Sequence, residues 1–129
     1  MSIVYNPTAI FEQNFDKNGV CTCKSKVITL AGATNNQLGV TAVTGKSIFV
    51  LSGNLRSAGL TSAVTFKSAS GGTNLYACQV PAIGDNPKNE KIEPQAWGAF
   101  HTNTAEGLYL DNTGADAVTV SLRYIEVVL

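Results

Sequence analysis

Alternation of apolar and polar residues on both sides of a turn-rich break is the feature that most constrains this sequence. Near the C-terminal end, the runs 108–110 and 117–124 alternate in this way and flank residues 112–116, Asn-Thr-Gly-Ala-Asp. Alternation places successive side chains on opposite faces of a sheet, and the break lets the chain reverse into a hairpin. The same pattern recurs along most of the chain, so we predict an all-β protein.

About eight strands are predicted, with glycines marking the turns between them. They span residues 24–30, 37–43, 46–55, 62–67, 74–80, 99–102, 107–110 and 117–127. Short strands at regular spacing favour an antiparallel β-sandwich, and we expect a jelly roll. Alternating positions of the best strands place one set of side chains in the core between the sheets, namely Phe66, Trp97, Leu108, Leu110, Val118, Val120 and Leu122.

The chain is expected to divide into an N-terminal arm, residues 1–20, and a single β-sandwich domain, residues 21–129. Apolar residues of the arm follow no period of two, which suggests a sticky arm that adds little to the stability of the body. A strand or turn packed on its own domain is an equal alternative. The candidate interface residues of the arm are Ile3, Val4, Tyr5, Ile10, Phe11 and Phe15.

The end of the last predicted strand is apolar on both faces, because Ile125, Val127, Val128 and Leu129 follow one another closely. Such a segment needs a cover, either a neighbouring strand or a neighbouring subunit. Ile125, Val127 and Leu129 therefore complete the candidate interface. With the low charge density of the chain, they predict self-association, and we expect a homotrimer.

Charge and hydropathy argue against two classes of partner. Nine basic residues balance nine acidic ones, and only 14% of the chain is charged. Nucleic-acid-binding proteins usually carry a basic excess, so no nucleic acid is expected. No run approaches the roughly 18 apolar residues that span a bilayer, and the first residues lack the pattern of a signal peptide, so no membrane is expected. An odd number of cysteines favours assembly in a reducing cytoplasm.

The longest predicted break, residues 81–93, is rich in proline and in charges of both signs. Long loops are often functional. A solvated loop is the favoured interpretation, and a specific contact is the alternative. The candidate contact loop carries Asp85, Lys88, Glu90, Lys91 and Glu93.

Candidate chemistry is sparse. Cys21, Cys23, Cys78 and His101 are the residues of metal-ligand type, but the Cys-x-Cys pair lacks a second matching pair, so we expect no metal and no other cofactor. The sole histidine could act as a catalytic acid or base only beside a positioned nucleophile, and the sequence indicates none, so we do not expect the protein to be an enzyme. The aromatic residues Tyr76, Trp97, Phe100, Tyr109 and Tyr124 suit a sandwich core or an interface better than a sugar-stacking site.

Several segments form a set of structural motifs: Val-Thr-Gly-Lys-Ser-Ile-Phe-Val-Leu at 43–51, Val-Thr-Phe-Lys-Ser at 64–68, Trp97, Phe100, Thr102, Glu-Gly-Leu-Tyr-Leu at 106–110 and Tyr-Ile-Glu-Val at 124–127. Together they resemble small virion proteins of tailed bacteriophages. The resemblance covers roughly residues 40–128, and it omits the first 25 residues and the charged stretch 83–93. Its motifs are structural rather than catalytic.

The resemblance implies a β-sandwich subunit that coats a virion. Head decoration is the favoured role: a capsid decoration or cement protein that binds the major capsid protein and stabilises the head at capsomer junctions, on the capsid surface. The alternative is a tail or capsid-surface adhesin that binds host carbohydrate. An exposed aromatic cluster around Trp97 would favour the adhesin, and a buried one the cement protein.

Overall fold

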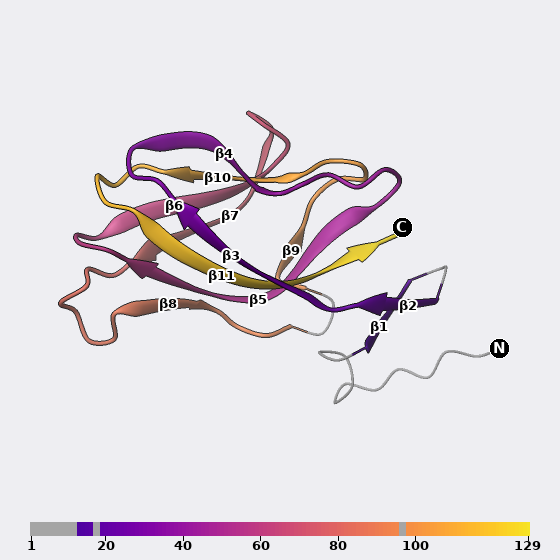
Figure 1. Cartoon of the computed structure of the whole chain (residues 1–129), viewed down its shortest axis with the longest axis horizontal. Coiled ribbons are helices and arrows are strands. Elements are labelled where there is room, and N and C mark those ends of the chain that lie inside the picture. The colour runs from indigo at the N-terminus through magenta and orange to yellow at the C-terminus, as the bar shows by residue number, and fades with distance from the viewer. Residues whose placement is uncertain (1–12, 17–18, 96–97) are drawn as a thin grey trace.

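The computed structural model describes residues 13–16, 19–95 and 98–129, with side chains from residue 22 onward (Figure 1). The described part contains eleven strands and no helix. The strands are β1 (Gln13–Asp16), β2 (Gly19–Thr22), β3 (Lys24–Leu30), β4 (Thr34–Val40), β5 (Ser47–Ser57), β6 (Ser62–Ser68), β7 (Thr73–Val80), β8 (Asn89–Ile92), β9 (Phe100–His101), β10 (Leu108–Asn112) and β11 (Val118–Val127).

The strands form a two-layer antiparallel sandwich beside a separate hairpin of β1 and β2 (Figure 1). One layer has the order β4-β10-β6-β7 and the other β3-β11-β5-β8, with β9 also paired to β5. The pairs are β3 with β11, β4 with β10, β5 with β8, and β6 with β7. The chain therefore forms one long hairpin that is folded over into two layers. This is the strand order of a jelly roll, and the predicted fold class is confirmed.

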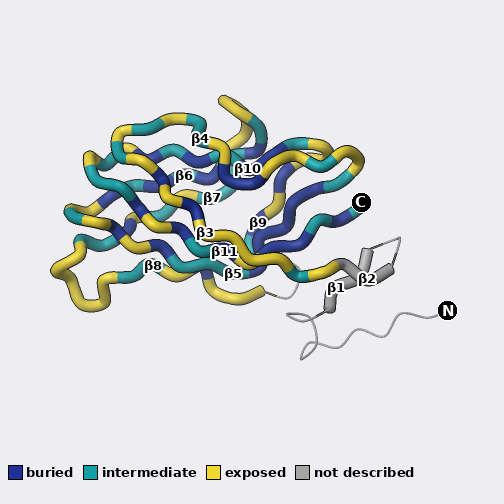
Figure 2. Tube along the Cα trace, viewed as in Figure 1, coloured by how far each residue is buried: buried dark blue, intermediate teal, exposed yellow. Residues whose placement is uncertain are grey.

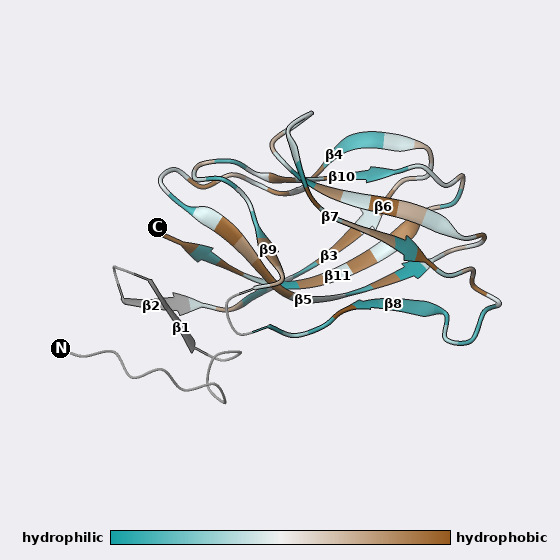
Figure 3. Ribbon diagram, turned by 180° about the vertical axis from the view of Figure 1, so that it is seen from behind, coloured by the Kyte–Doolittle hydropathy of each residue, from teal (hydrophilic) through white to brown (hydrophobic). Residues whose placement is uncertain are grey.

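The core lies between the layers and follows the predicted period of two. In β6, Ser62, Val64, Phe66 and Ser68 are buried, while the residues between them are half-buried. Figure 3 shows hydrophobic stretches along β5, β6 and β11. Six residues of the predicted core are buried, and Trp97 lies outside the described residues; the six are Phe66, Leu108, Leu110, Val118, Val120 and Leu122.

A buried asparagine joins two turns at one end of the sandwich. Asn112, at the end of β10, is 1% exposed. Its Nδ2 donates to the carbonyl oxygens of Ala31 at 3.1 Å and Asp116 at 2.9 Å, and its Oδ1 accepts from the Gly114 N–H at 2.9 Å. The Ala33 N–H donates to the Gly114 carbonyl at 2.6 Å. The β3–β4 turn and the β10–β11 turn are therefore held together through one side chain.

One strand occurs where the sequence indicated a loop. Residues 81–93 were expected to form one continuous break, but β8 (Asn89–Ile92) pairs with β5. Ile92 is 2% exposed and lies opposite Gly53, so a single apolar side chain anchors an otherwise polar strand. Charged residues are common on edge strands, where they hinder pairing with other chains. The loop is thus confined to residues 81–88, which are mostly exposed (Figure 2).

Candidate interaction surfaces

The first candidate surface is the arm end, which we define as the β1–β2 hairpin together with Val128 and Leu129. The C-terminus lies at this end of the sandwich, and β1 and β2 contact β11 (Figure 1). Leu129 is 59% exposed. Phe15 lies in β1, but its side chain is outside the described set. The other candidate interface residues of the arm also lie outside the described residues: Ile3, Val4, Tyr5, Ile10 and Phe11.

A second apolar cluster covers the outer face of the sheet beside the arm end. It consists of Phe49, Leu51, Ile125 and Val127, all at most 9% exposed. The His101 ring stacks on Phe49, with the ring centroids 4.5 Å apart. The two-sided apolar end of β11 therefore finds its cover within the same chain, which is one of the two expected solutions. Ile125 and Val127 are buried without a second subunit, and only Leu129 of the predicted C-terminal interface is exposed.

The five charged residues of the predicted contact loop do not form one cluster. Asp85 and Lys88 lie in the exposed loop at the opposite end from the arm end (Figures 1 and 2). Glu90 and Lys91 belong to β8, and Glu93 follows that strand on the surface. The structure therefore separates this set into a loop pair and a sheet-edge group.

Cys23 and His101 both contact the second apolar cluster, whereas Cys78 lies apart from them. Cys23 packs against the second apolar cluster, and Cys78 packs against the main core. Burial, with a smaller effect of the Glu90 charge, raises the pKa of the Cys78 thiol to about 11. Among the described side chains, no three His, Cys, Asp or Glu residues are grouped so as to hold a metal ion. The Cys21 side chain is outside the described set.

The described aromatic residues belong mainly to the core. The rings of Phe66 and Phe100 are 5.1 Å apart, and Tyr76 stacks on Phe100 at 5.2 Å. Tyr124 is 9% exposed. Burial raises the pKa values of Tyr76 and Tyr124 above the ordinary tyrosine value. These rings are engaged with one another and with the core, so they do not form an exposed stacking platform.

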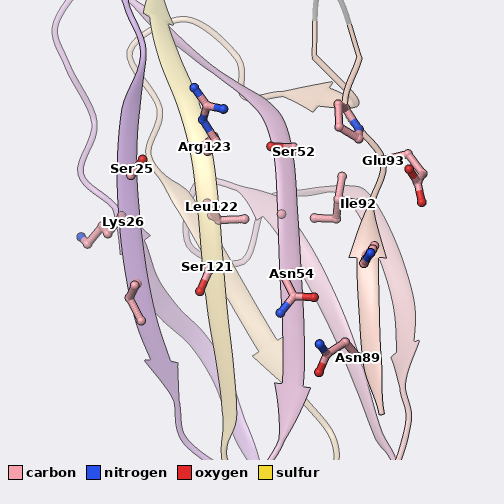
Figure 4. Close-up of a pocket in the computed structure, with 14 residues that line it drawn as sticks. Ser25, Lys26, Ser52, Asn54, Asn89, Ile92, Glu93, Ser121, Leu122 and Arg123 are labelled. Atoms are coloured by element: carbon pink, nitrogen blue, oxygen red, sulfur yellow. The ribbon is translucent and has the colours of Figure 1, made fainter. Parts of the chain in front are cut away.

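The second candidate surface is a groove of about 720 Å³ on the outer face of the β3-β11-β5-β8 layer (Figure 4). We call it the outer-face groove. Its lining comes from all four strands and from the segment that follows β8; the residues are Ser25, Lys26, Val27, Ser52, Gly53, Asn54, Asn89, Lys91, Ile92, Glu93, Pro94, Ser121, Leu122 and Arg123. Its volume falls within the range of small-molecule sites, about 300–1,000 Å³.

Cross-strand register brings the polar residues of the outer-face groove into rows. Arg123 lies between Ser25 of β3 and Ser52 of β5. In the next row, Ser121 is paired with Asn54, and Asn54 in turn with Lys91. Neighbouring strands are about 4.8 Å apart, so each row presents its polar groups at regular spacing across the sheet.

Cations dominate the outer-face groove. Lys91 and Arg123 are exposed basic residues of its lining, whereas Lys26 points away from it in Figure 4. Glu93 is the one acidic residue of the lining and lies beyond β8, at the edge. An adjoining hollow of about 410 Å³ shares Asn54 and Ser121 with the groove and adds Arg56. Basic residues therefore outnumber acidic ones in the lining of the groove, although the chain as a whole is neutral.

Among the described side chains, two ion pairs lie on other parts of the molecule. Lys24 pairs with Glu126, and this hydrogen bond and charge raise the pKa of the lysine. On the other layer, Lys67 Nζ lies 2.6 Å from Asp111 Oδ2. Burial alone would raise the pKa of Asp111, but the hydrogen bonds from Lys67 and from the Asn36 N–H outweigh it and lower the pKa.

Sequence reasoning missed the outer-face groove. Its polar residues lie far apart along the chain, with Ser52 and Arg123 paired only through the register of β5 and β11. One signal was present: alternation in the last strand places Ser121 and Arg123 on the face opposite Val120 and Leu122. A row of polar outward positions on a central strand indicates a solvated face, but the partner strands are needed to recognise a site.

Comparisons with known proteins leave the family open. No family model matches the chain, and no curated protein matches it. Solved structures include a similar chain from the Bacillus endospore appendages, described as a novel family of disulfide-linked pili. It is 16% identical, the match covers 90% of this chain and 96% of that one, and the TM-score is 0.49. Similarity at this level supports no inference about function. In the described part of the chain, no helix is long and apolar enough to cross a membrane.

Proposed function

We propose that the chain is a structural virion protein, a capsid decoration or cement subunit that binds the major capsid protein and stabilises a bacteriophage head at capsomer junctions. The sequence resemblance to small virion proteins suggested this role. It predicts a non-enzymatic subunit that is assembled in the host cytoplasm and ends up on the capsid surface.

The observation that carries the proposal is the difference between the two ends of the molecule. The arm end gathers the hairpin, the C-terminus and the exposed Leu129, whereas the loop 81–88 lies at the opposite end (Figure 1). A compact body with an apolar segment at one end suits a subunit that attaches by that end and leaves its other end in solvent. Both described apolar clusters lie between Cys23 and Val127, so the body has its own core.

Deletion of residues 1–12 tests the attachment. We expect the truncated chain to unfold cooperatively at nearly the same temperature, because the two sheets formed by β3 to β11 enclose a core of their own. We also expect its binding to heads of its own phage, prepared without this protein, to be lost in co-sedimentation. Lys88→Ala, in the loop at the other end, is the control and should bind like the unaltered chain. Undiminished binding of the truncated chain would exclude attachment through the arm, and loss for Lys88→Ala instead would place attachment at the loop.

A trimer is the expected state of the isolated protein. Closed symmetric homo-oligomers are the usual assemblies of subunits of this kind, and the exposed Leu129 and the apolar arm provide contact surface. Light scattering coupled to size-exclusion chromatography should give a mass about three times the 13.5 kDa of one chain. A monomer at tens of micromolar would contradict this expectation.

A second candidate function is favoured by the outer-face groove. A tail or capsid-surface adhesin needs a site for carbohydrate, and the groove combines a suitable volume with hydroxyl, amide and basic side chains. This role does not depend on the attachment of the arm end.

A further inference from the structure

We infer that the outer-face groove binds an acidic saccharide, with a sugar carboxylate held between Arg123 and Lys91 and sugar hydroxyls bonded to Ser52, Asn54 and Ser121. The inference deepens the second candidate function and is independent of capsid attachment. Its test uses the isolated protein without phage heads, so failure of one proposal leaves the other standing.

The basic residues are placed to recognise a carboxylate. Arg123 and Lys91 lie on strands to either side of β5, so an anion over Ser52 and Asn54 would lie between two positive charges. A guanidinium carries five N–H donors in a planar fork that matches a carboxylate. The Arg123 Nη2 also donates to the Cys23 Sγ at 3.5 Å, so this side chain lies along the face of the sheet toward the segment between β2 and β3. Positive charge on both sides of a polar floor favours an anionic occupant.

The floor of the groove favours a sugar over a protein segment. Ser25, Ser52 and Ser121 each donate and accept hydrogen bonds, as sugar hydroxyls do, and Asn54 adds an amide. Two large apolar residues of the lining, Leu122 and Ile92, are each 2% exposed and turned toward each other over Gly53, in the core (Figure 4). Val27 is 66% exposed and lies on β3, beside Ser121, where it could pack against the apolar face of a sugar ring. Protein interfaces usually have an apolar or aromatic centre. The described centre of this groove is instead hydroxyl and amide.

A buried hydrogen-bond acceptor at the edge of the groove also favours a ligand that carries hydroxyl groups. Asn89 lines the groove from β8, and its Oδ1 is buried with no hydrogen-bond partner among the described residues. Buried polar atoms in proteins are nearly always paired, and an unpaired one is costly. A small rotation of this amide toward a ligand hydroxyl would supply the missing donor.

The test is a titration of the isotope-labelled protein with three carboxylated probes: tetragalacturonate, a hyaluronan tetrasaccharide and trisialic acid. Backbone amide shifts report the site, and calorimetry gives the affinity. We expect at least one probe to bind, with shifts confined to residues 25–27, 52–54, 89–94 and 119–123. The methyl ester of that probe, which keeps the sugar but removes the charge, should bind about tenfold more weakly, the value of one charge-assisted hydrogen bond.

Matched variants test which basic residues of the groove bind the sugar carboxylate. Arg123→Gln and Lys91→Gln should each weaken binding about tenfold, Lys91→Gln without changing the melting temperature. Lys46→Gln, just before the start of β5, should leave binding unchanged. If Arg123→Gln is unstable, the result for Lys91→Gln decides. The inference is overturned if none of the probes binds, if the shifts lie elsewhere, or if the methyl ester binds equally well. Tighter binding of a hexa-aspartate peptide in the same groove would overturn it in favour of an acidic protein segment.

Discussion

Leu122→Ala is expected to lower the free energy of unfolding by about 2–5 kcal/mol, the usual cost of truncating a buried leucine. Leu122 is 2% exposed on the inner face of β11, between β3 and β5, and belongs to the main core. Domains of this size have net stabilities of about 5–15 kcal/mol, so the loss would be a large share of the total. Urea unfolding with an unchanged slope would measure it.

Thr119→Ala is the matched control on the same strand. Thr119 points to the opposite face and is exposed, so the substitution should change stability by only about 0.5 kcal/mol. Equal losses for the two variants would contradict the register of β11 and the position of the core on that face of the sheet.

Asn112→Asp should destabilise the sandwich by about 3 kcal/mol or more at neutral pH. The change replaces an amide donor by a carboxylate oxygen opposite the carbonyls of Ala31 and Asp116, in a site that is 1% exposed. Unsatisfied buried groups cost about 1–3 kcal/mol each, and charged ones cost more. Thermal unfolding should show the loss, and Asn74→Asp, the same change at an exposed position of β7, should show little.

The pH dependence of this variant provides a second readout. Burial against carbonyl oxygens should raise the pKa of the introduced carboxyl in the folded state above its unfolded value of about 3.9. A group of this kind contributes stability below its unfolded pKa and loses it as the pH rises through the folded pKa. The variant should therefore lie closer to the unaltered chain near pH 3.5 than at pH 7. A constant difference over this range would mean that the carboxyl reaches solvent.

The fold was readily predicted because its signal is local. Alternation gave β3 as Lys24–Leu30 with the correct ends, and it assigned the two faces of β11 correctly. Strand β8 was missed because its four residues, Asn-Glu-Lys-Ile, contain a single buried side chain and lie in a stretch rich in charge and proline. Only the pairing with β5 makes it a strand, and that pairing is not visible in the segment itself.

The candidate sites were less predictable because they depend on contacts between distant residues. Alternation indicated that Ile125 and Val127 lie on the face opposite the main core, but the residues that pack against them, Phe49 and Leu51, are far away in the sequence. The outer-face groove likewise exists only once β5, β8 and β11 are in register. The sequence of a strand indicates which side chains point to each face of the sheet. Recognising a surface site also requires the order in which the strands pair.

The wrapped-hairpin pairing has a consequence for how the protein forms during translation. Strand β11 is the last strand of the described chain to be synthesised, yet it lies between β3 and β5 in the middle of its layer. Until residues 118–127 have left the ribosome, β3 has no partner on that side and the edge of β5 stays open. Unpaired strand edges on nascent chains promote aggregation. We therefore expect the sandwich to close only once β11 has left the ribosome, and chains stalled before β11 to depend on chaperones.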